Sequence, residues 1–567
     1  MTALKDALDR LRAQRPAAER AGLTSLADEI TASGIGFAAV GGRFEQRWIQ
    51  ALAELQQCVK PLGEHSRLDG APAPEPVLNE GGPYYGTWLE STGTINTEML
   101  ARFAPETATR TFSLLAAHQR QDGLIPYKVT DAGPGFSQIQ LVTPPARSVW
   151  THYRLGGGDR EWLRRMYDAL ARYDQWLARH RDTRGSGAVE AFCTFDTGHD
   201  LSPRFWFAPD RCRDGEASRV DPEAPGVPYI APDLTAAVAC QREHLGRMAA
   251  ELGEDAAPWR GKHQASLEAL FEQCYAPEDE FFYDRDASGA AVRVRSDVLL
   301  RVVAAEVGDE ALFESVMRRH LMHTGRFLAH YGFTSIALDD PRFDADYTRN
   351  SWAGPVNFLS LLRAPHAFEH RGRTAELAVA SRPVMAALAA AESFPQCMDP
   401  FSGAAGYTSV YSPSILWFLD AVERYSGILP VPGAQRSWTD RDGEPGIWFT
   451  SLAPTRLGSG HGADAQAVAY SRTVGGTRYE LAADDEQTLT FRDGEEHLRF
   501  PRGWRIEADA SGVPTAVVGV LPRSTSGTLE HAGRSLRLTL APNERVELGG
   551  MQETSRRSPG FVPPQHS

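Results

Sequence analysis

The spacing of apolar residues predicts a largely helical chain. Leu4, Leu8 and Leu11 recur at helical spacing among charged residues, which indicates an amphipathic helix at the N-terminus. From about residue 44 to residue 428, stretches of helical length alternate with short segments rich in proline, glycine and aspartate, the residues that begin or end helices. These stretches predict about eleven helices.

The predicted helices come in pairs separated by short breaks. The three glycines 156–158 separate one pair and Gly308 separates another, while Asp233 and Asp255 stand where N-cap residues are expected. A solenoid would repeat with a fixed period, whereas the spacing here is irregular. We therefore expect an all-α (α/α)6 barrel, a toroid of six helical hairpins. The paired stretches are 140–155 with 159–181, 233–252 with 255–275, 296–307 with 309–321 and 352–369 with 374–392, and single stretches cover 44–59, 95–119 and 412–425.

The pattern changes after Pro432. Short segments rich in β-branched residues, such as 477–481 and 515–520, follow one another with turn signals like Asp493-Gly494 between them. They predict a small C-terminal antiparallel β domain beside the barrel. The expected divisions are an N-terminal helical extension (1–43), the barrel with the catalytic site (44–430), the β domain (433–550) and a mobile tail (551–567).

Composition narrows the possible partners. The net charge of −14 and the sequence pI of about 5.6 disfavour nucleic acids and anionic membranes, which select basic surfaces. No apolar run resembles a secretory or membrane-spanning segment, so we expect a cytoplasmic protein with no membrane partner. The expected ligand is neutral or weakly charged. The sequence leaves the oligomeric state open.

No motif points to a cofactor or a metal. The six cysteines are scattered without ligand spacing, which fits reduced thiols, and the signatures of nucleotide and zinc sites are absent. His366 and His370 have the i, i+4 spacing that can bind a metal, but no third ligand stands near them in sequence. We expect a polar cluster at a helix end there, no cofactor and no metal.

The chemistry concentrates in the segment 195–206. It contains two carboxylates, Asp196 and Asp200, together with His199, Arg204 and Trp206. Cleavage of a glycosidic bond needs an acid to protonate the leaving oxygen, aromatic faces for the sugar ring and groups that hold hydroxyls. This segment supplies all three, with Asp200 as the candidate acid. The alternative is an Asx turn between helices in which the arginine pairs a carboxylate for structural reasons.

Several further segments resemble one family when taken together with this one. They are Tyr84-Tyr85-Gly86-Thr87-Trp88-Leu89-Glu90-Ser91, the turn Gln119 to Pro126, the loop Asp196 to Arg204, the helix start Pro232 to Ala236 with Trp259 beyond it, the segment Tyr347 to Phe358, and Phe394-Pro395-Gln396-Cys397-Met398-Asp399-Pro400. Over residues 75–430 the chain is similar to the six-hairpin glycosidases, which include the trehalases, glycoside hydrolase family 63 and the bacterial mannosylglycerate and glucosylglycerate hydrolases. The resemblance implies the (α/α)6 fold, an inverting glycosidase and Asp200 as its general acid.

One position departs from the family. Where relatives carry the glutamate of F-P-E-Y as the general base, this chain has Gln396, and an amide cannot take a proton from water. We expect Glu90 or, second, Glu190 to act as the base, with Gln396 positioning the nucleophile. Asp399 is expected to hold a turn. Candidate substrate contacts are Tyr85, Trp88, Gln140, Trp150, Asp196, His199, Arg204, Trp206, Asn350, Trp352 and Asn357, with structural roles as the alternative for Asp196 and for part of the tryptophans.

The predicted function is an exo-acting, inverting glycoside hydrolase that cleaves a short α-linked glycoside or glycosyl conjugate. Two other functions stay open. An inverting phosphorylase would need no base, because phosphate is already an anion, and Arg349, Arg363 or Arg371 could bind it. A catalytically silent carbohydrate-binding protein would keep the cup after losing the base.

Overall fold

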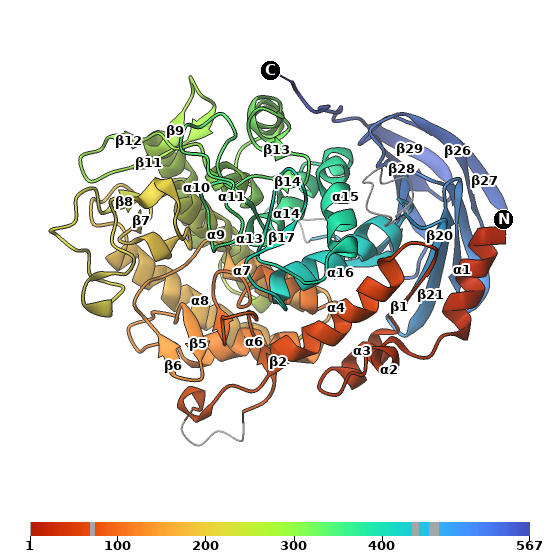
Figure 1. Ribbon diagram of the computed structural model, residues 1–567, viewed down its shortest axis with the longest axis horizontal. Helices are drawn as coiled ribbons and strands as arrows, with labels where there is room; N and C mark the ends of the chain where they lie inside the picture. The colour runs from red at the N-terminus through yellow and green to blue at the C-terminus, as the bar shows by residue number, and fades with distance from the viewer. Residues whose placement is uncertain (1, 69–73, 434–441, 453–463, 567) are drawn as a thin grey trace.

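The chain folds into a helical part and a β part that share one hydrophobic core (Figure 1). The computed structural model describes residues 2–68, 74–433, 442–452 and 464–566. Residues 434–441 and 453–463 of the predicted β domain, and the last residue of the predicted tail, lie outside the described residues. In the described part of the chain, no helix is long and apolar enough to cross a membrane.

The helical part begins at α4 and ends at α16. Its helices are α4 (Phe44–Cys58), α5 (Ile95–Leu100), α6 (Pro105–Ala117), α7 (Pro145–Arg154), α8 (Arg160–His180), α9 (Pro232–Leu252), α10 (Ala257–Cys274), α11 (Val298–Ala304), α12 (Glu310–Val316), α13 (Phe358–Leu361), α14 (Ala364–Glu369), α15 (Thr374–Ala390) and α16 (Ser412–Ser426). Local chemistry sets several of these ends. Asp159 caps α8 by accepting from the backbone N of Trp162 at 2.7 Å, and α9 stops at Gly253 in the left-handed conformation.

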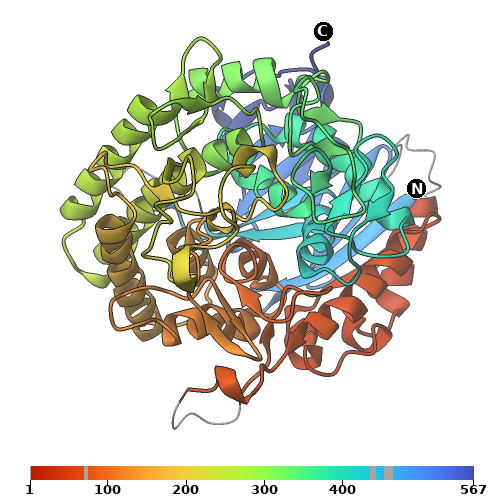
Figure 2. The same ribbon diagram turned by 60° about the vertical axis from the view of Figure 1, so that its left-hand side comes forward.

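Alternate helices form an inner ring. Helix α5 contacts α7, α7 contacts α9, α9 contacts α11, and α11 contacts α14; α16 contacts α13 and returns to α5. The other helices lie outside them, as α10 does on α9 and α6 on α5. Figure 2 shows these helices arranged around the centre in chain order. The predicted helix pairs therefore exist, although 95–119 and 352–369 are each broken into shorter pieces.

The predicted all-α class is wrong. The described residues contain a seven-stranded sheet, a six-stranded sheet and several smaller sheets. The small sheets lie in the loops between helices, for example β4–β5–β6 (Thr87–Trp88, Lys128–Thr130 and Gly133–Gly135) and β7–β8–β11–β12 (Glu190–Ala191, Tyr229–Ile230, Asp284–Arg285 and Ala291–Val292). Strands of two or three residues are too short to produce a periodic pattern, so the sequence could not reveal them.

The two large sheets face each other as a sandwich. The first runs β1–β20–β21–β22–β23–β26–β27 and the second β18–β19–β24–β25–β28–β29. Phe449 of β19 (Gly446–Thr450) and Tyr479 of β21 (Thr477–Asp484) pack with ring centroids 5.6 Å apart, which joins the two inner faces. The remaining strands are β18 (Ile428–Val431), β20 (Ala467–Val474), β22 (Gln487–Arg492), β23 (Glu495–Pro501), β24 (Trp504–Asp509), β25 (Pro514–Gly519), β26 (Thr525–His531), β27 (Arg534–Leu540), β28 (Arg545–Gly549) and β29 (Gln552–Arg557).

The N-terminal segment belongs to this sandwich. Strand β1 (Gly36–Val40) pairs antiparallel with β20, and helix α1 (Thr2–Ala13) packs on β1, β20 and β21 (Figure 1). Leu4, Leu8 and Leu11 are buried there, as their spacing predicts. The expected helical extension thus contains a strand, because its partner strand comes from the other end of the chain.

The C-terminal segment is docked. Strand β29 pairs with β28, the backbone N of Val562 donates to Glu376 on α15 at 2.9 Å, and the backbone N of Gln565 donates to the Met322 carbonyl at 2.7 Å. These contacts hold the segment that its position at the chain end predicted to be a mobile tail.

Candidate active site

A cavity of about 230 Å³ opens among the loops of the helical part. Five regions meet there: the segment before α5, the segment between α6 and α7, the loop around Asp200, the segment that leads into α13 together with the start of α13, and the loop between α15 and α16. The lining residues are Glu80, Tyr84, Trp88, Glu90, Ser91, Tyr127, Lys128, Gln138, Gln140, Phe195, Gly198, Asp200, Arg211, Asn350, Leu359, Gln396 and Tyr411.

Asp200 lies on the cavity wall in a loop with a fixed backbone. Its carbonyl accepts a hydrogen bond from the backbone N of Trp352 at 3.0 Å, and its Oδ2 accepts from the side-chain amide of Asn350. Burial raises the pKa of Asp200 to about 7, and the negative charge of Asp210 adds to the rise, while the Asn350 bond opposes it. Asp200 therefore carries a proton through much of the range in which a glycosidase needs one.

Buried ion pairs fix the loop beneath Asp200. Arg204 donates to Asp233 with two bonds of 2.8 and 2.6 Å and to Asp284 with two bonds of 2.5 and 2.6 Å. His199 binds Asp297 at 2.7 Å, and burial lowers the pKa of His199 to about 4, so the ring is neutral at pH 7. The carboxylates come from α9 (Asp233), from β11 (Asp284) and from the residue before α11 (Asp297), so tertiary contacts hold the loop in place.

Glu90 lines the same cavity and is buried. Its Oε2 accepts a hydrogen bond of 2.7 Å from Gln140, and its Oε1 lies 3.9 Å from Nη2 of Arg301 and 3.8 Å from Nη2 of Arg363. Within the described residues, Oε1 accepts no hydrogen bond. Burial raises the pKa of Glu90 to about 7, against the two guanidinium groups, which favour the anion. The Oε1 oxygen is buried and faces the two guanidinium groups.

The Asp200 loop packs directly on Glu90. Gly198 has a φ of 66°, and a Cβ at this position would lie 2.3 Å from Oε2 of Glu90. Only glycine therefore allows this approach, because any larger residue meets both backbone strain and the carboxylate.

Substitution of this glycine should disturb both groups. Gly198→Ala should lower kcat/KM on the order of tenfold and destabilise the protein by about 1–3 kcal/mol, because either the loop or Glu90 must move. Steady-state kinetics and thermal unfolding check this expectation, and Gly215→Ala, at a positive-φ glycine with open space around it, is the matched control. Equal effects of the two changes would show that backbone strain alone acts.

Gln396 is joined to Asp200 through one side chain. Its Nε2 donates to Oδ1 of Asn350 at 2.8 Å, and Asn350 in turn donates to Asp200. The Oε1 of Gln396 has no hydrogen-bond partner among the described residues. This buried amide oxygen therefore keeps an unused acceptor next to the cavity.

The structure brings together only part of the predicted site. Asp200, Glu90, Gln396, Trp88, Gln140 and Asn350 line the cavity. Glu190 does not: it is buried and accepts from the backbone and hydroxyl of Thr183 and from Nε of Arg184. Asp196, His199, Arg204, Trp352, Asn357, Trp150, Tyr85 and Trp206 are also absent from the lining.

The polar residues outside the lining support the loops. Asp196 accepts two bonds from Arg181, of 2.5 and 3.0 Å, and Asn357 caps α13 by accepting from the backbone N of Leu359 at 3.0 Å. The geometry therefore supports a structural role for Asp196 and Arg204 rather than direct contact with a sugar.

The four aromatic candidates have different surroundings. Trp352 is fully buried against His199, with ring centroids 4.9 Å apart, and Trp150 donates to Asp442 at 3.1 Å. Trp206 is 59% exposed. Tyr85, also 59% exposed, borders a second cavity of about 380 Å³ that shares Tyr84 with the first. Side-chain burial depends on packing that residue type alone does not specify.

Sequence reasoning missed Glu80, a third buried carboxyl group in the lining. Ser91 donates to it, Thr92 donates at 3.1 Å and Tyr411 at 2.7 Å, and burial raises its pKa. The available signal was its place in Asn79-Glu80-Gly81-Gly82, a turn just ahead of the aromatic motif. The lining also gains Lys128, whose Nζ lies 5.3 Å from the centroid of the Trp88 ring.

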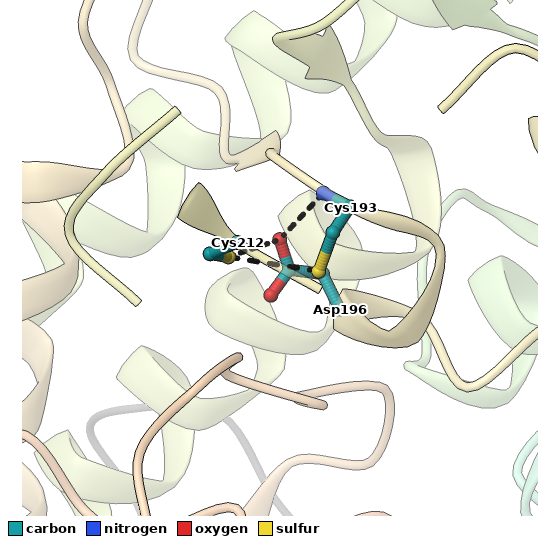
Figure 3. Close-up of side chains that lie close together, drawn as sticks. All are labelled: Cys193, Asp196 and Cys212. Carbon is teal, nitrogen blue, oxygen red and sulfur yellow. Dashed lines mark hydrogen bonds between the residues drawn. The ribbon is translucent and has the colours of Figure 1, made fainter. Parts of the chain in front are cut away.

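One cluster in the described residues has the composition of a metal site: Cys193, Asp196 and Cys212 (Figure 3). The Asp196 oxygens already accept from Arg181 and from the backbone N of Ile139 and Phe192, and an arginine beside the thiols supplies the cation. The cluster therefore does not suit a metal. His366 binds Glu98 at 3.0 Å, and His370 lies 3.8 Å from Glu306, which makes them a polar cluster as expected.

The family is shown by sequence comparison. The fold and this match define the class of the protein, which is a glycoside hydrolase. Residues 84–414 match the profile of the mannosylglycerate hydrolase MGH1-like glycoside hydrolase domain, which spans more than half of the chain. The chain therefore belongs to this family, and the resemblance drawn from its motifs is confirmed. No curated protein matches the chain in sequence.

Solved structures share the fold at low identity. The mannosylglycerate hydrolase of Thermus thermophilus, solved with Tris and D-glycerate, is 18% identical, with a TM-score of 0.54 over 66% of this chain and 99% of that one. A structure described as a sialidase is 13% identical, with a TM-score of 0.59 over 85% of this chain and 42% of that one. The family 78 rhamnosidase of Bacillus sp. GL1 is 12% identical, with a TM-score of 0.51 over 80% and 40%.

Proposed function

We propose that the protein is an exo-acting, inverting hydrolase of a short α-linked glycoside or a small glycosyl conjugate, with Asp200 as general acid and Glu90 as general base. One observation carries the proposal: the half-buried Asp200 and the buried Glu90 line one cavity with pKa values raised to about 7. Of these two, within the described residues, Glu90 is the one with guanidinium groups at 3.9 and 3.8 Å. The guanidinium groups favour the Glu90 anion, whereas the amide of Asn350 is the group that binds Asp200. Because both pKa values lie near 7, the state that the reaction needs, with Asp200 protonated and Glu90 ionised, is populated near neutral pH.

This state supports hydrolysis in one displacement. Asp200 protonates the glycosidic oxygen as the bond to the anomeric carbon breaks, and Glu90 takes a proton from the water that attacks the opposite face of the ring. The free Oε1 of Gln396 accepts a hydrogen bond from this water or from a ring hydroxyl. Gln396 thus positions a reactant, although it cannot take a proton.

The cavity volume supports a small substrate. Pockets for drug-sized ligands measure about 300–1,000 Å³, and this cavity of about 230 Å³ is smaller. It suits a single sugar ring that enters from a chain end or from a small conjugate. Trp88 and Tyr84, whose rings lie 5.8 Å apart in an edge-to-face arrangement, offer apolar surface to that ring.

The contacts of the three arginines argue against phosphorolysis. Arg349 pairs with Asp346 at 2.6 Å, and Arg371 donates to the backbone carbonyls of Glu306 and Gly308. Arg363 faces Glu90, whose negative charge would repel a phosphate ion. A catalytically silent binding protein would need only one carboxylate in the cavity. Three carboxyl groups, those of Asp200, Glu90 and Glu80, line it.

A substrate screen tests the proposed function. Disaccharides and small glycosyl conjugates are incubated with the protein with and without inorganic phosphate, and proton NMR follows the anomeric form of the released sugar. We expect release without phosphate and a first-formed sugar of inverted configuration. Release that requires phosphate, or a first product of retained configuration, would overturn the assignment.

The pH dependence of kcat/KM should reveal the ionisation of both Asp200 and Glu90. Because Glu90 must be ionised and Asp200 protonated, kcat/KM should peak near pH 7 and fall about tenfold per pH unit on both sides, well beyond each pKa. Asp210→Asn should move the alkaline limb to lower pH, since Asp210 is a negative charge that raises the pKa of Asp200. A profile that stays flat from pH 5 to pH 9 would contradict the acid and base roles.

A further inference from the structure

Two thiols meet beneath the loop that carries Asp200. The Sγ atoms of Cys193 and Cys212 lie 3.6 Å apart, both residues are buried, and both are free cysteines (Figure 3). Cys193 follows β7, and Cys212 precedes the short turn Arg213–Gly215. Asp200 lies between them in sequence, so the pair marks the two ends of its loop.

The backbone holds the two ends side by side. The N of Thr194 donates to the Pro209 carbonyl at 2.9 Å, and the N of Phe195 donates to the Asp210 carbonyl at 3.2 Å. The closeness of the sulfur atoms therefore follows from paired segments rather than from one side-chain rotamer. A disulfide bond is about 2.05 Å long, so the sulfurs, now 3.6 Å apart, need to approach by about 1.5 Å.

The surroundings favour sulfur chemistry over metal binding. Nη2 of Arg181 lies 3.5 Å from Sγ of Cys212 and also binds Asp196. This guanidinium occupies the position that a bound cation would take beside the two sulfur atoms. Because Arg181 donates to the Cys212 sulfur, we assign Cys212 as the sulfur that attacks first.

We propose that Cys193 and Cys212 form a disulfide when the protein meets a peroxide, and that this bond closes the Asp200 loop. The Cys212 thiolate attacks one oxygen of hydrogen peroxide, which gives a sulfenic acid and hydroxide. The Cys193 sulfur then attacks the sulfenic sulfur, so that the S–S bond forms, the S–O bond breaks and water leaves. In sum, two thiols lose two electrons and two protons, and one peroxide becomes two water molecules.

The bond should reach the cavity through adjacent residues. Phe195 stands two residues after Cys193, Arg211 stands next to Cys212, and both line the cavity. Pulling the sulfurs together shifts these two side chains relative to each other. This consequence rests on the proposed function of the cavity, whereas formation of the bond does not.

Counting thiols tests the bond without any activity assay. The native protein is treated with a small excess of hydrogen peroxide, quenched with catalase, denatured and alkylated, and its intact mass is measured. We expect the alkylated thiols to fall from the six of the sequence to four, and peptide mapping should join Cys193 to Cys212. Cys274→Ser, at a buried cysteine that ends α10, should lose two thiols in the same way.

The single variants identify the order of the steps. In Cys193→Ser the sulfenic acid on Cys212 should persist and react with dimedone. Six alkylated thiols after oxidation, a disulfide that joins other cysteines, or a zinc ion that copurifies with the native protein and is lost in Cys212→Ser would overturn the proposal.

Measurements of KM test whether the disulfide changes the cavity. Oxidised native enzyme should show a severalfold change in KM that dithiothreitol reverses, and Cys212→Ser, which lacks the sulfur that attacks the peroxide, should show no reversible change after the same treatment. A complete disulfide with an unchanged KM would overturn the link to the cavity. Because the thiol count needs no substrate, it still decides on the bond if the proposed glycosidase activity fails.

Discussion

Asp200→Asn should lower kcat on natural glycosides by about 10²–10⁴-fold, because the amide cannot protonate the leaving oxygen. The loss should depend on the leaving group. An aryl glycoside such as a dinitrophenyl glycoside leaves without protonation, so the variant should hydrolyse it at a rate close to that of the native enzyme. Steady-state kinetics on both kinds of substrate measure this difference. A similar loss on both substrates would indicate that Asp200 binds the sugar and is not the acid.

The fold of this variant can be checked separately. Because the pKa of Asp200 is raised to about 7 in the folded state, the native protein holds this proton more tightly than the unfolded chain between about pH 4 and pH 7. Its free energy of unfolding therefore falls as the pH rises through that window, as far as Asp200 contributes. Asp200→Asn removes this contribution and should gain stability relative to the native protein at pH 8. Asp210→Asn, an exposed change in the same loop, should retain kcat near the optimum.

Glu90→Gln should lower kcat by about 10²–10⁴-fold on natural and aryl glycosides alike, because the water must be deprotonated whatever the leaving group. Azide is a nucleophile that needs no base, so it should restore turnover and give a glycosyl azide of inverted configuration. The rate against azide concentration and the NMR spectrum of the product measure the rescue. The contrast with Asp200→Asn separates the two roles in one pair of experiments.

A matched substitution sharpens this test. Glu190 was the second candidate base, and its carboxylate holds Thr183 and Arg184 outside the cavity. Glu190→Gln should lower the melting temperature, and azide should not speed its turnover. If azide fails to rescue Glu90→Gln and KM rises sharply, Glu90 binds the substrate and another group activates the water.

Glu90 is the carboxylate that we propose takes the role of the glutamate that relatives carry at the position of Gln396. Arg301 and Arg363 lie 3.9 and 3.8 Å from Oε1 of Glu90 and favour its ionised form, and this oxygen accepts no hydrogen bond within the described part of the chain. Arg363 stays cationic at neutral pH even though burial lowers its pKa to about 10. We infer that the carboxylate moved within the site while the amide of Gln396 kept a positioning role.

The sequence by itself determined the paired helices, the family and the two carboxyl groups of the proposed mechanism. Helical spacing and the glycine and aspartate breaks are local properties, so they locate α7 to α10 closely. The motif around Asp200 and the aromatic segment before Glu90 carry chemistry in their residue types. Both segments line the cavity, and the glycoside hydrolase class follows from the matched family.

The tertiary structure alone decided the β content and the partners of each polar group. Strand β1 pairs with β20 from the far end of the chain, and strands of two residues leave no periodic signal. Arg204 was a candidate sugar contact, but its guanidinium donates to Asp233 and Asp284. Glu190 was a candidate base, but its carboxylate accepts a hydrogen bond from Arg184. These partners are distant in sequence, and a side chain's hydrogen bonds depend on what packing brings beside it. For the same reason only the structure could place Cys193 against Cys212.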